Sequence, residues 1–208
     1  GSDGTVGANK NSAKIIGDHA GMYTQAYFEY DTKKSYGITK SHLRFSKKPI
    51  RSTYLIKAAD FLACHAQSYI NRYDMIHEIK DGGTFLLNTS WAAEELSEKL
   101  PGDVRRYIAD HKINFYIVDA NRLADELGLG NHSNMILQAA FFKLSGVMPV
   151  EDAVRYMKDA VQKTYGKKGE KVVGMNMAAV DAGINSPVKV QIPVEWSQAC
   201  DDRVIDST

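Results

Sequence analysis

The chain has 208 residues, 44% of them hydrophobic and 25% charged, which suits one domain or one and a half with room for a sizeable core. Its formal net charge of +1 gives no overall field that would favour nucleic acid or a membrane surface as a partner. The two cysteines, Cys64 and Cys200, lie far apart in the sequence, so neither a disulfide framework nor a paired-cysteine metal site is indicated.

The chain opens on a glycine-rich loop that runs into a helix. Gly1, Gly4 and Gly7 recur at every third position, and the apolar spacing becomes helical from Val6 onward. Backbone N–H groups at the start of a helix have no partner inside it and lie at its positive end, so this stretch predicts a phosphate site. Because the spacing matches neither of the common phosphate-loop motifs, a capped helix with a flexible start is the alternative.

Glycine loops of this kind normally follow a strand that anchors them, and no strand precedes Gly1. Either Gly1 and Ser2 are left over from cloning or the chain was separated from a larger protein just after that strand. We favour the second explanation.

The next segment is predicted to be strand-rich. Aromatic and alternating residues indicate strands at 22–30 and 38–45, followed by an extended segment at 50–56. The polar turn 31–37 carries Lys33 and Lys34, and these lysines could bind an anion or be simply solvated.

From Asp60 onward, short apolar strands alternate with helices. We predict strands at 60–64, 84–88 and 113–118, a turn at 81–83, and helices at 67–80, 94–100, 103–112, 120–127, 131–144, 150–165 and 171–182. Such alternation predicts an α/β fold, a three-layer sandwich whose mostly parallel or mixed central sheet is covered by helices. Residues 1–185 are expected to form one domain. Residues 186–208 show no clear period and are expected to form an arm or linker that packs on something else.

Few residues outside the opening loop indicate chemistry. The six histidines lack metal-ligand spacing, no G-x-S-x-G motif occurs, and Cys64, in an apolar run, is predicted to be a buried reduced thiol. Asp119 follows a buried strand and could bind a ligand, although capping of the next helix is favoured. Asn131 can cap a helix, which would place Asn134 in its first turn for either ligand contact or capping.

The chain has no apolar run of 18 residues and no secretory leader, so a cytoplasmic location is expected.

Several segments together resemble one family. The stretch GSDGTVGANKNS at 1–12 closely resembles the opening of the gamma-type domain of pyruvate:ferredoxin (flavodoxin) oxidoreductases. The resemblance continues, in the same order, through SHLRF at 41–45, KKPIRSTYLI at 47–56, ACH at 63–65 and NMILQAAFFK at 134–143.

This resemblance implies a role in converting pyruvate and CoA to acetyl-CoA and CO2, with electrons passed to ferredoxin or flavodoxin. It implies thiamine diphosphate, Mg and [4Fe-4S] clusters on other domains of the parent enzyme, which is expected to be a cytoplasmic homodimer. This domain would hold CoA and deliver it, and would contribute no catalytic residue and no metal ligand. The resemblance implies that the CoA site includes Gly1, Ser2, Asp3, Gly4, Thr5, Val6, Lys33, Lys34 and Asn134.

Two other classes of function stay open on the sequence. The chain could belong to another 2-oxoacid:ferredoxin oxidoreductase, since the residues that choose the oxoacid lie elsewhere. It could also be a non-catalytic module that binds a different phosphate-bearing ligand or docks other domains. No nucleic acid or membrane partner is expected.

Overall fold

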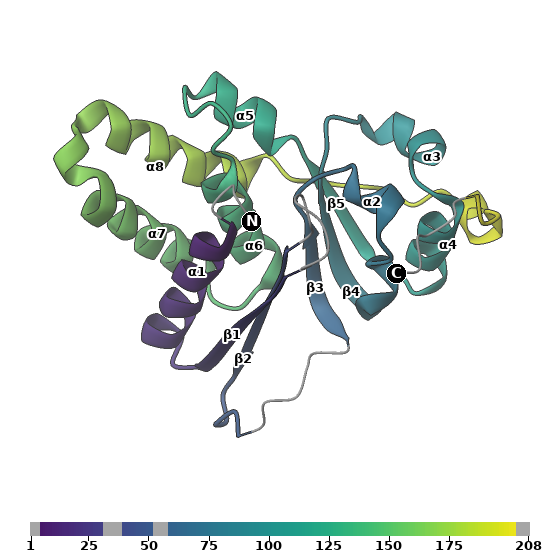
Figure 1. Ribbon diagram of the computed structural model, residues 1–208, viewed down its shortest axis with the longest axis horizontal. Coiled ribbons are helices and arrows are strands. Elements are labelled where there is room, and N and C mark those ends of the chain that lie inside the picture. The colour runs from purple at the N-terminus through teal and green to yellow at the C-terminus, as the bar shows by residue number, and fades with distance from the viewer. Residues whose placement is uncertain (1–4, 31–38, 52–57, 203–208) are drawn as a thin grey trace. The chain divides into compact units, whose positions relative to one another are not determined.

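The computed structural model describes residues 5–30, 39–51 and 58–202 (Figure 1). The chain divides into two compact units. The helical unit comprises Gly1–Leu55 and Leu123–Asn185, and the sheet unit comprises Ile56–Arg122 and Ser186–Thr208. The domain ranges expected from the sequence, 1–185 and 186–208, stay a prediction for the longer protein.

The helical unit combines one strand pair with four long helices. Its elements are α1 (Thr5–His19), β1 (Tyr23–Tyr30), β2 (Thr39–Ser46), α6 (Asn134–Ser145), α7 (Val150–Tyr165) and α8 (Glu170–Asn185). Strands β1 and β2 pair antiparallel, from Tyr23 opposite Ser46 to Tyr30 opposite Thr39. The two strands predicted at 22–30 and 38–45 are therefore confirmed. The turn at 31–37 and most of the segment 50–56 lie outside the described residues.

The core of the helical unit lies where these helices meet. Ile16 of α1, Phe142 of α6, Met157 and Val161 of α7 and Val180 of α8 belong to one buried apolar cluster. Met157 and Val161 are four residues apart and so share one face of α7, which explains why the apolar period predicted residues 150–165 correctly. The helix predicted at 131–144 begins instead at Asn134, and Gly146 ends it with a φ of +64°, a left-handed conformation that favours glycine.

The sheet unit is built on four strands in the order β3-β4-β5-β6. Strands β3 (Ala59–Cys64), β4 (Ile79–Asn88) and β5 (Asn114–Val118) are parallel, and β6 (Val188–Lys189) pairs antiparallel with β5. The helical elements are α2 (Tyr69–Arg72), η1 (Ile76–Glu78), η2 (Ala93–Glu95), α3 (Leu96–Lys99), α4 (Gly102–Asp110) and η4 (Val194–Gln198), while α5 (Ala120–Glu126) joins the two units. The predicted α/β class, with a mixed sheet and packed helices, is confirmed.

The helix predicted at 67–80 is wrong. Only Tyr69–Arg72 forms α-helix, the backbone becomes extended at Tyr73, and β4 already begins at Ile79. The apolar residues that suggested a helical face, Ile70, Ile76 and Ile79, are all buried in the core of the sheet unit. Their spacing therefore predicted correctly that these residues are buried. They lie in three short elements, α2, η1 and β4, and not in one helix.

The turn predicted at 81–83 is an irregularity inside β4. The pairing with β3 shifts between Ala59, opposite Ile79, and Phe61, opposite Thr84. Gly82 has a φ of +71°, and a Cβ at Gly83 would lie 2.6 Å from Cγ2 of Ile79 and 2.9 Å from the Lys80 carbonyl oxygen. The glycines thus permit a bulge, and β4 begins at Ile79, five residues before the strand predicted at 84–88.

The segment after residue 185 packs on this chain's own sheet unit. Trp196 of η4 is 1% exposed, its ring centroid lies 6.4 Å from that of Phe115, and its Nε1 donates a hydrogen bond to Ser97 Oγ at 2.8 Å. The expectation that this segment packs elsewhere is therefore wrong for its described part. The absence of a period reflects an irregular path, not an absence of packing.

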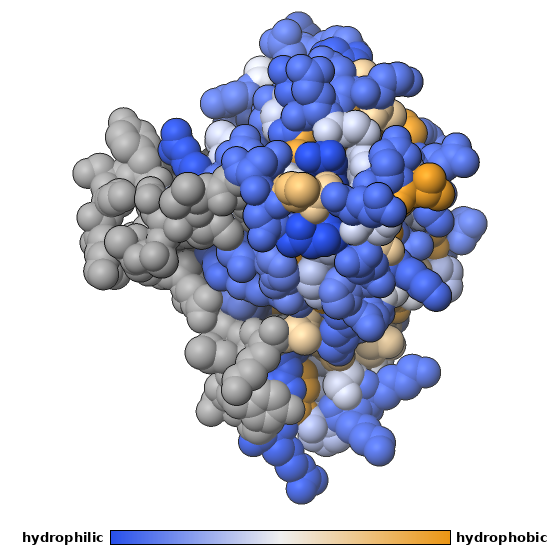
Figure 2. Space-filling model, turned by 90° about the vertical axis from the view of Figure 1, so that its right-hand side faces the viewer, coloured by the Kyte–Doolittle hydropathy of each residue, from blue (hydrophilic) through white to orange (hydrophobic). Residues whose placement is uncertain are grey.

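Figure 2 shows one face of the molecule, mainly hydrophilic among the described residues, with apolar residues scattered singly.

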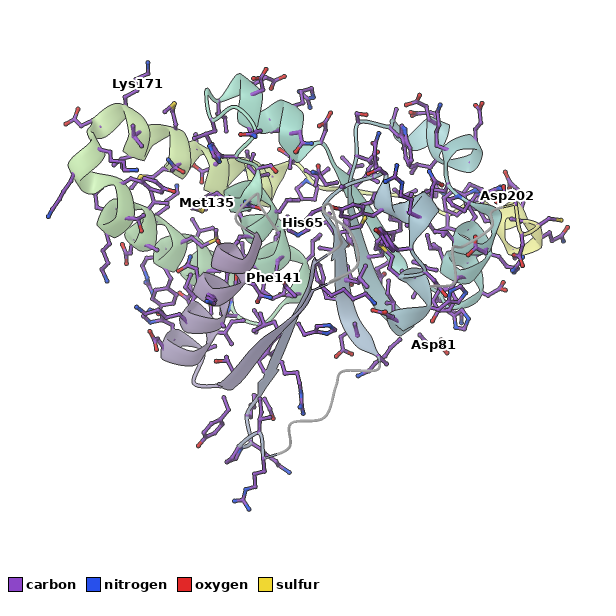
Figure 3. All side chains as sticks on the ribbon, viewed as in Figure 1. His65, Asp81, Met135, Phe141, Lys171 and Asp202 are labelled. Atoms are coloured by element: carbon purple, nitrogen blue, oxygen red, sulfur yellow. The ribbon has the colours of Figure 1, made fainter. Side chains whose placement is uncertain are left out.

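Residues 199–202, which we call the C-terminal strap, are held against α4. Asp202 Oδ1 accepts a hydrogen bond of 2.7 Å from the Gly102 N–H at the start of α4, and Figure 3 shows Asp202 beside that helix. Arg106 donates to the Ala199 carbonyl oxygen at 2.7 Å and also pairs with Asp201. A Cβ at Gly102 would lie 2.8 Å from the Cys200 carbonyl carbon, so the strap can approach only because residue 102 has no side chain.

We expect Gly102→Ala to lower the free energy of unfolding by about 1–3 kcal/mol, because the added methyl must displace the strap and its hydrogen bonds. The measurement is urea unfolding followed by circular dichroism. Gly174→Ala is the matched control, since a Cβ at this position in α8 meets nothing within 4 Å. It should raise stability by about 0.5–1 kcal/mol through helix propensity. Equal effects of the two substitutions would contradict the close packing at Gly102.

Candidate functional site

The predicted phosphate site is only partly within the described residues. Gly1, Ser2, Asp3 and Gly4, together with Lys33 and Lys34, lie outside them. Thr5 and Val6 form the first turn of α1, so the helix begins directly after the glycine loop. The backbone therefore places the unpartnered N–H groups of a 15-residue helix at the position where the sequence predicts an anion.

Asn134 lies in the first turn of α6, as predicted, but Asn131 does not cap this helix. Ser133 occupies the capping position and its side chain makes no capping hydrogen bond. The chain reaches this point through tight turns, in which Gly128 and Gly130 have φ values of +80° and +58°. These turns delay the helix by three residues, and the half-buried Asn134 becomes its first residue.

The two helices that carry these residues pack against each other in the helical unit. Ile15 and Ile16 of α1 share an apolar cluster with Ala139 and Phe142 of α6. Figure 1 shows the amino end of α1 beside α6, and Figure 3 shows Met135, near the start of α6, toward that same end, with Phe141 farther along. The structure thus packs the helix that begins at Thr5 against the helix that begins at Asn134. The start of each helix carries a partial positive charge, which favours an anionic ligand.

Two amide side chains near these helix starts were missed by the sequence analysis. Gln138 of α6 is 6% exposed, and its Nε2 has no hydrogen-bond partner. Asn9 of α1 has a buried Oδ1 that also lacks a partner. The only signal in the sequence was their position four residues after Asn134 and Thr5, because such residues share a helix face. A polar residue on that face does not by itself indicate a site.

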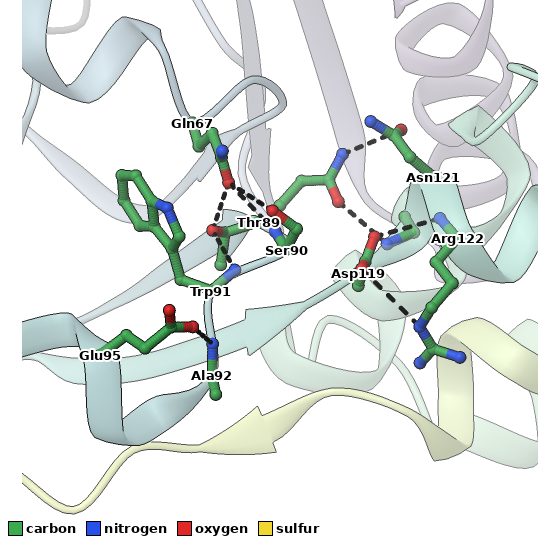
Figure 4. A network of polar contacts seen from close by, with 11 residues as sticks. Gln67, Thr89, Ser90, Trp91, Ala92, Glu95, Asp119, Asn121 and Arg122 are labelled. Carbon is green, nitrogen blue, oxygen red and sulfur yellow. Dashed lines mark hydrogen bonds and ion pairs between the residues drawn. The ribbon is translucent and has the colours of Figure 1, made fainter. Parts of the chain in front are cut away.

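In the sheet unit, a second polar cluster lies at the carboxyl ends of the parallel strands (Figure 4). Asn88 Nδ2 donates to the His65 carbonyl oxygen at 3.0 Å and to Asn121 Oδ1 at 3.3 Å, while Asn88 Oδ1 accepts from Ala120 N at 2.9 Å. The neighbouring Thr89 donates to Gln67 Oε1 at 2.6 Å. Asn88 uses both ends of its amide to tie the strand ends together, so its role is structural.

Asp119 belongs to the same cluster and caps α5. Its Oδ1 accepts a hydrogen bond of 3.1 Å from the Arg122 N–H, and its Oδ2 lies 3.7 Å from Arg122 Nε. The favoured prediction for Asp119, capping rather than ligand binding, is therefore confirmed.

Cys64 is buried at the end of β3, as predicted. Burial raises the pKa of the Cys64 thiol to about 12, while the hydrogen bond from its Sγ to the Ala66 carbonyl oxygen acts in the opposite direction. A thiol with this pKa stays protonated at neutral pH and is a poor nucleophile or metal ligand. Cys200, in contrast, is exposed.

Residues 1–186 match the family described as pyruvate ferredoxin/flavodoxin oxidoreductase. The chain belongs to this family. It is 55% identical over 208 residues to the pyruvate:ferredoxin oxidoreductase of Moorella thermoacetica, and the aligned region covers 100% of this chain and 18% of that protein. It is 56% identical over 205 residues to the pyruvate-flavodoxin oxidoreductase of Enterobacter agglomerans, covering 99% of this chain and 17% of that protein. The chain thus spans less than a fifth of the length of these relatives.

Solved structures of subunits and complexes share the fold. The pyruvate oxidoreductase subunit PORC from Thermotoga maritima aligns with a TM-score of 0.68 at 16% identity, covering 91% of this chain and 93% of that subunit. A 2-oxoglutarate:ferredoxin oxidoreductase from Magnetococcus marinus, with 2-oxoglutarate, coenzyme A and succinyl-CoA bound, aligns with a TM-score of 0.63 at 17% identity. It covers 99% of this chain and 31% of that one.

The residues of this chain do not fit an iron–sulfur cluster. Such clusters are usually held by four cysteine thiolates, and the sequence has two cysteines, of which Cys64 is buried with a raised pKa. Across residues 5–30, 39–51 and 58–202, no group of three or more His, Cys, Asp or Glu side chains could hold a metal ion. Over the same residues, no helix is both long and apolar enough to cross a membrane.

We expect one thiol per native chain to react with iodoacetamide at pH 8, because Cys200 is exposed and Cys64 is buried and protonated. Mass spectrometry after labelling should show a single adduct, and a second adduct should form only in denaturant. The Cys200→Ser variant is the control and should stay unlabelled in its native state. Labelling of Cys64 in that native variant at the rate of the unfolded chain would contradict the assigned burial.

Proposed function

We propose that this chain is the CoA-binding domain of a multidomain pyruvate:ferredoxin or flavodoxin oxidoreductase. Membership of that family supports the proposal, and the relatives in which the corresponding segment is less than a fifth of the protein support a multidomain parent. The observation that carries the assignment to CoA is that α1 begins at Thr5, directly after the glycine loop, with the start of α6 at Asn134 on a helix packed against it.

CoA suits this arrangement because it carries a pyrophosphate and a 3′-phosphate. A helix start with a glycine loop, Gly1 to Val6, can receive one phosphate through backbone N–H groups. The ammonium charges of Lys33 and Lys34 would neutralise another phosphate, and Asn134 would offer an amide. The Magnetococcus marinus complex adds support, since that protein shares the fold and is described with coenzyme A bound.

In this proposal the domain holds and delivers CoA but does not perform the chemistry. Other domains of the parent would hold the thiamine diphosphate with Mg that supplies the chemistry for converting pyruvate and CoA to acetyl-CoA and CO2. They would also hold the [4Fe-4S] clusters that supply electron transfer to ferredoxin or flavodoxin. The proposed parent is a cytoplasmic homodimer. The names of the relatives at 55% and 56% identity favour pyruvate over another 2-oxoacid.

The proposal predicts that the 208-residue chain binds CoA and that charge reversal at Lys33→Glu/Lys34→Glu weakens the Kd about tenfold or more, because two cations near phosphate are replaced by anions. Isothermal titration calorimetry at two salt concentrations measures both effects, and wild-type affinity should fall as salt screens the phosphate charge. Lys167→Glu/Lys168→Glu, an exposed lysine pair in η3 (Gly166–Lys168), is the matched control and should leave the Kd unchanged.

Two results would redirect the assignment. Binding of ATP or NAD without any response to CoA would identify a module for another phosphate-bearing ligand. An unchanged CoA affinity after charge reversal at Lys33 and Lys34 would favour a docking role for their loop.

We also expect the 208-residue chain alone to reduce no ferredoxin when supplied with pyruvate and CoA, because its residues hold neither the thiamine site nor the clusters. The assay follows reduction of ferredoxin by absorbance under anaerobic conditions. A full-length oxidoreductase serves as positive control. Turnover by the 208-residue chain would contradict the proposal that other domains perform the chemistry.

A further inference from the structure

Gln138 is a buried amide whose donor is unused. The side chain is 6% exposed, and its Nε2 makes no hydrogen bond. Buried amide N–H groups are nearly always paired, because an unpaired one has lost its water without gaining a partner. A donor kept in this state indicates a partner that is not part of the described residues.

Gln138 is also placed to face the start of its own helix. It lies four residues after Asn134 and therefore on the same face of α6. Long side chains on a helix lean toward its amino end and cover the preceding turn. A side chain at position 138 with this direction covers the first turn of α6, where Asn134 is found.

Asn9 occupies the corresponding position on α1. It is four residues after Thr5, the first helical residue, and its Oδ1 is buried without a partner. Asn9 shares a helix face with Ser12 and Ile16, which are 4% and 0% exposed. That face is therefore the inner side of α1.

Both amides belong to the same packed region of the helical unit. Ile16, on the face of α1 that carries Asn9, and Phe142, four residues after Gln138 on α6, belong to one apolar cluster. The unit leaves one acceptor, Asn9 Oδ1, and one donor, Gln138 Nε2, unused near the amino ends of two helices in contact.

The hydroxyls of Ser41 and Ser145 in the helical unit also lack a partner, but a third buried amide of the unit has one. Asn176 of α8 is buried to a similar degree, 7% exposed, and its Nδ2 donates to the Val172 carbonyl oxygen at 2.9 Å. A buried amide in the same unit therefore has its partner where no ligand is expected.

The chemistry of the unused atoms points to an amide ligand. Phosphate oxygens only accept hydrogen bonds at neutral pH, so they could satisfy Gln138 Nε2 but not Asn9 Oδ1. A ligand amide offers one C=O acceptor and one N–H donor, which match the two atoms. The pantetheine arm of CoA contains two amides, whereas its diphosphate contains none.

We propose that Asn9 and Gln138 bind the amide groups of the pantetheine arm of CoA, a step that rests on the CoA site proposed above. The Gln138 Nε2–H donates to an arm carbonyl, and an arm N–H donates to Asn9 Oδ1. Through these contacts the two residues set the direction in which the thiol end of CoA leaves the phosphate site.

The test compares two ligands on the 208-residue chain by isothermal titration calorimetry. CoA has the arm, and adenosine 3′,5′-bisphosphate has the adenine and phosphates without it. Asn9→Leu and Gln138→Met replace the amide groups with apolar groups on side chains of similar shape and length. Each should weaken CoA binding about three- to tenfold and leave bisphosphate binding unchanged. The melting temperature of the free variants should stay the same or rise, since an unpaired buried amide has been removed.

Asn176→Leu is the matched control, because it removes a buried amide that already has a partner. It should leave CoA affinity unchanged. A CoA analogue with esters in place of the pantetheine amides tests the wild-type chain directly and does not depend on the folding of any variant. It should bind more weakly than CoA.

The outcomes separate the two proposals. Equal weakening of CoA and bisphosphate, or an unchanged affinity for CoA in both variants, overturns the assignment of Asn9 and Gln138 and leaves the CoA site standing. Equal affinity of the wild-type chain for CoA and its ester analogue overturns it as well. Absence of CoA binding to the wild-type chain overturns the proposed function, and this inference with it.

Discussion

The close contact between α6 and α8 is the constraint on which the helical unit depends. A Cβ at Gly183 of α8 would lie 2.6 Å from Ala139 Cβ and 3.0 Å from the Ile136 carbonyl carbon of α6, so these helices meet with no side chain between them at that point. Helix α6 also contacts α1 and α7, and all four helices contribute to one apolar cluster. The position of α6 therefore fixes where its first residue, Asn134, lies relative to α1.

This constraint explains how the proposed binding site can be placed without strong local signals. Neither Asn134 nor Thr5 belongs to a motif that specifies a ligand by its spacing. The contact between the two helices that begin at these residues follows from burial of Ile16 and Phe142, which are 0% exposed. Burial of large apolar side chains contributes about 1.5–3 kcal/mol each, so this packing can hold α1 and α6 together.

Features set by residues close together in the sequence could be predicted, whereas features set by contacts between distant residues could not. Helix α7 was predicted with correct bounds because Met157 and Val161 repeat at helical spacing and Pro149 precedes its first residue. The helix at 67–80 failed because burial of Ile70, Ile76 and Ile79 arises from three separate elements, which periodicity cannot distinguish from one. The packing of Trp196 on Phe115 joins residues 81 positions apart, and no local pattern reports such a contact.

The candidate site also combines local features, which could be predicted, with features that depend on the folded structure, which could not. The start of α1 after the glycine loop and the place of Asn134 in a first turn are local properties, and both were predicted. The state of Asn9 and Gln138 depends on what surrounds them after folding, so it could not be inferred from their identity. A buried amide that lacks a partner costs about 1–3 kcal/mol, and a fold retains such groups against that cost most readily where a ligand supplies the missing partner. A site that holds its polar atoms ready in the free chain also loses less conformational entropy when the ligand binds, which favours a domain whose proposed task is to hold CoA in one orientation for chemistry performed elsewhere.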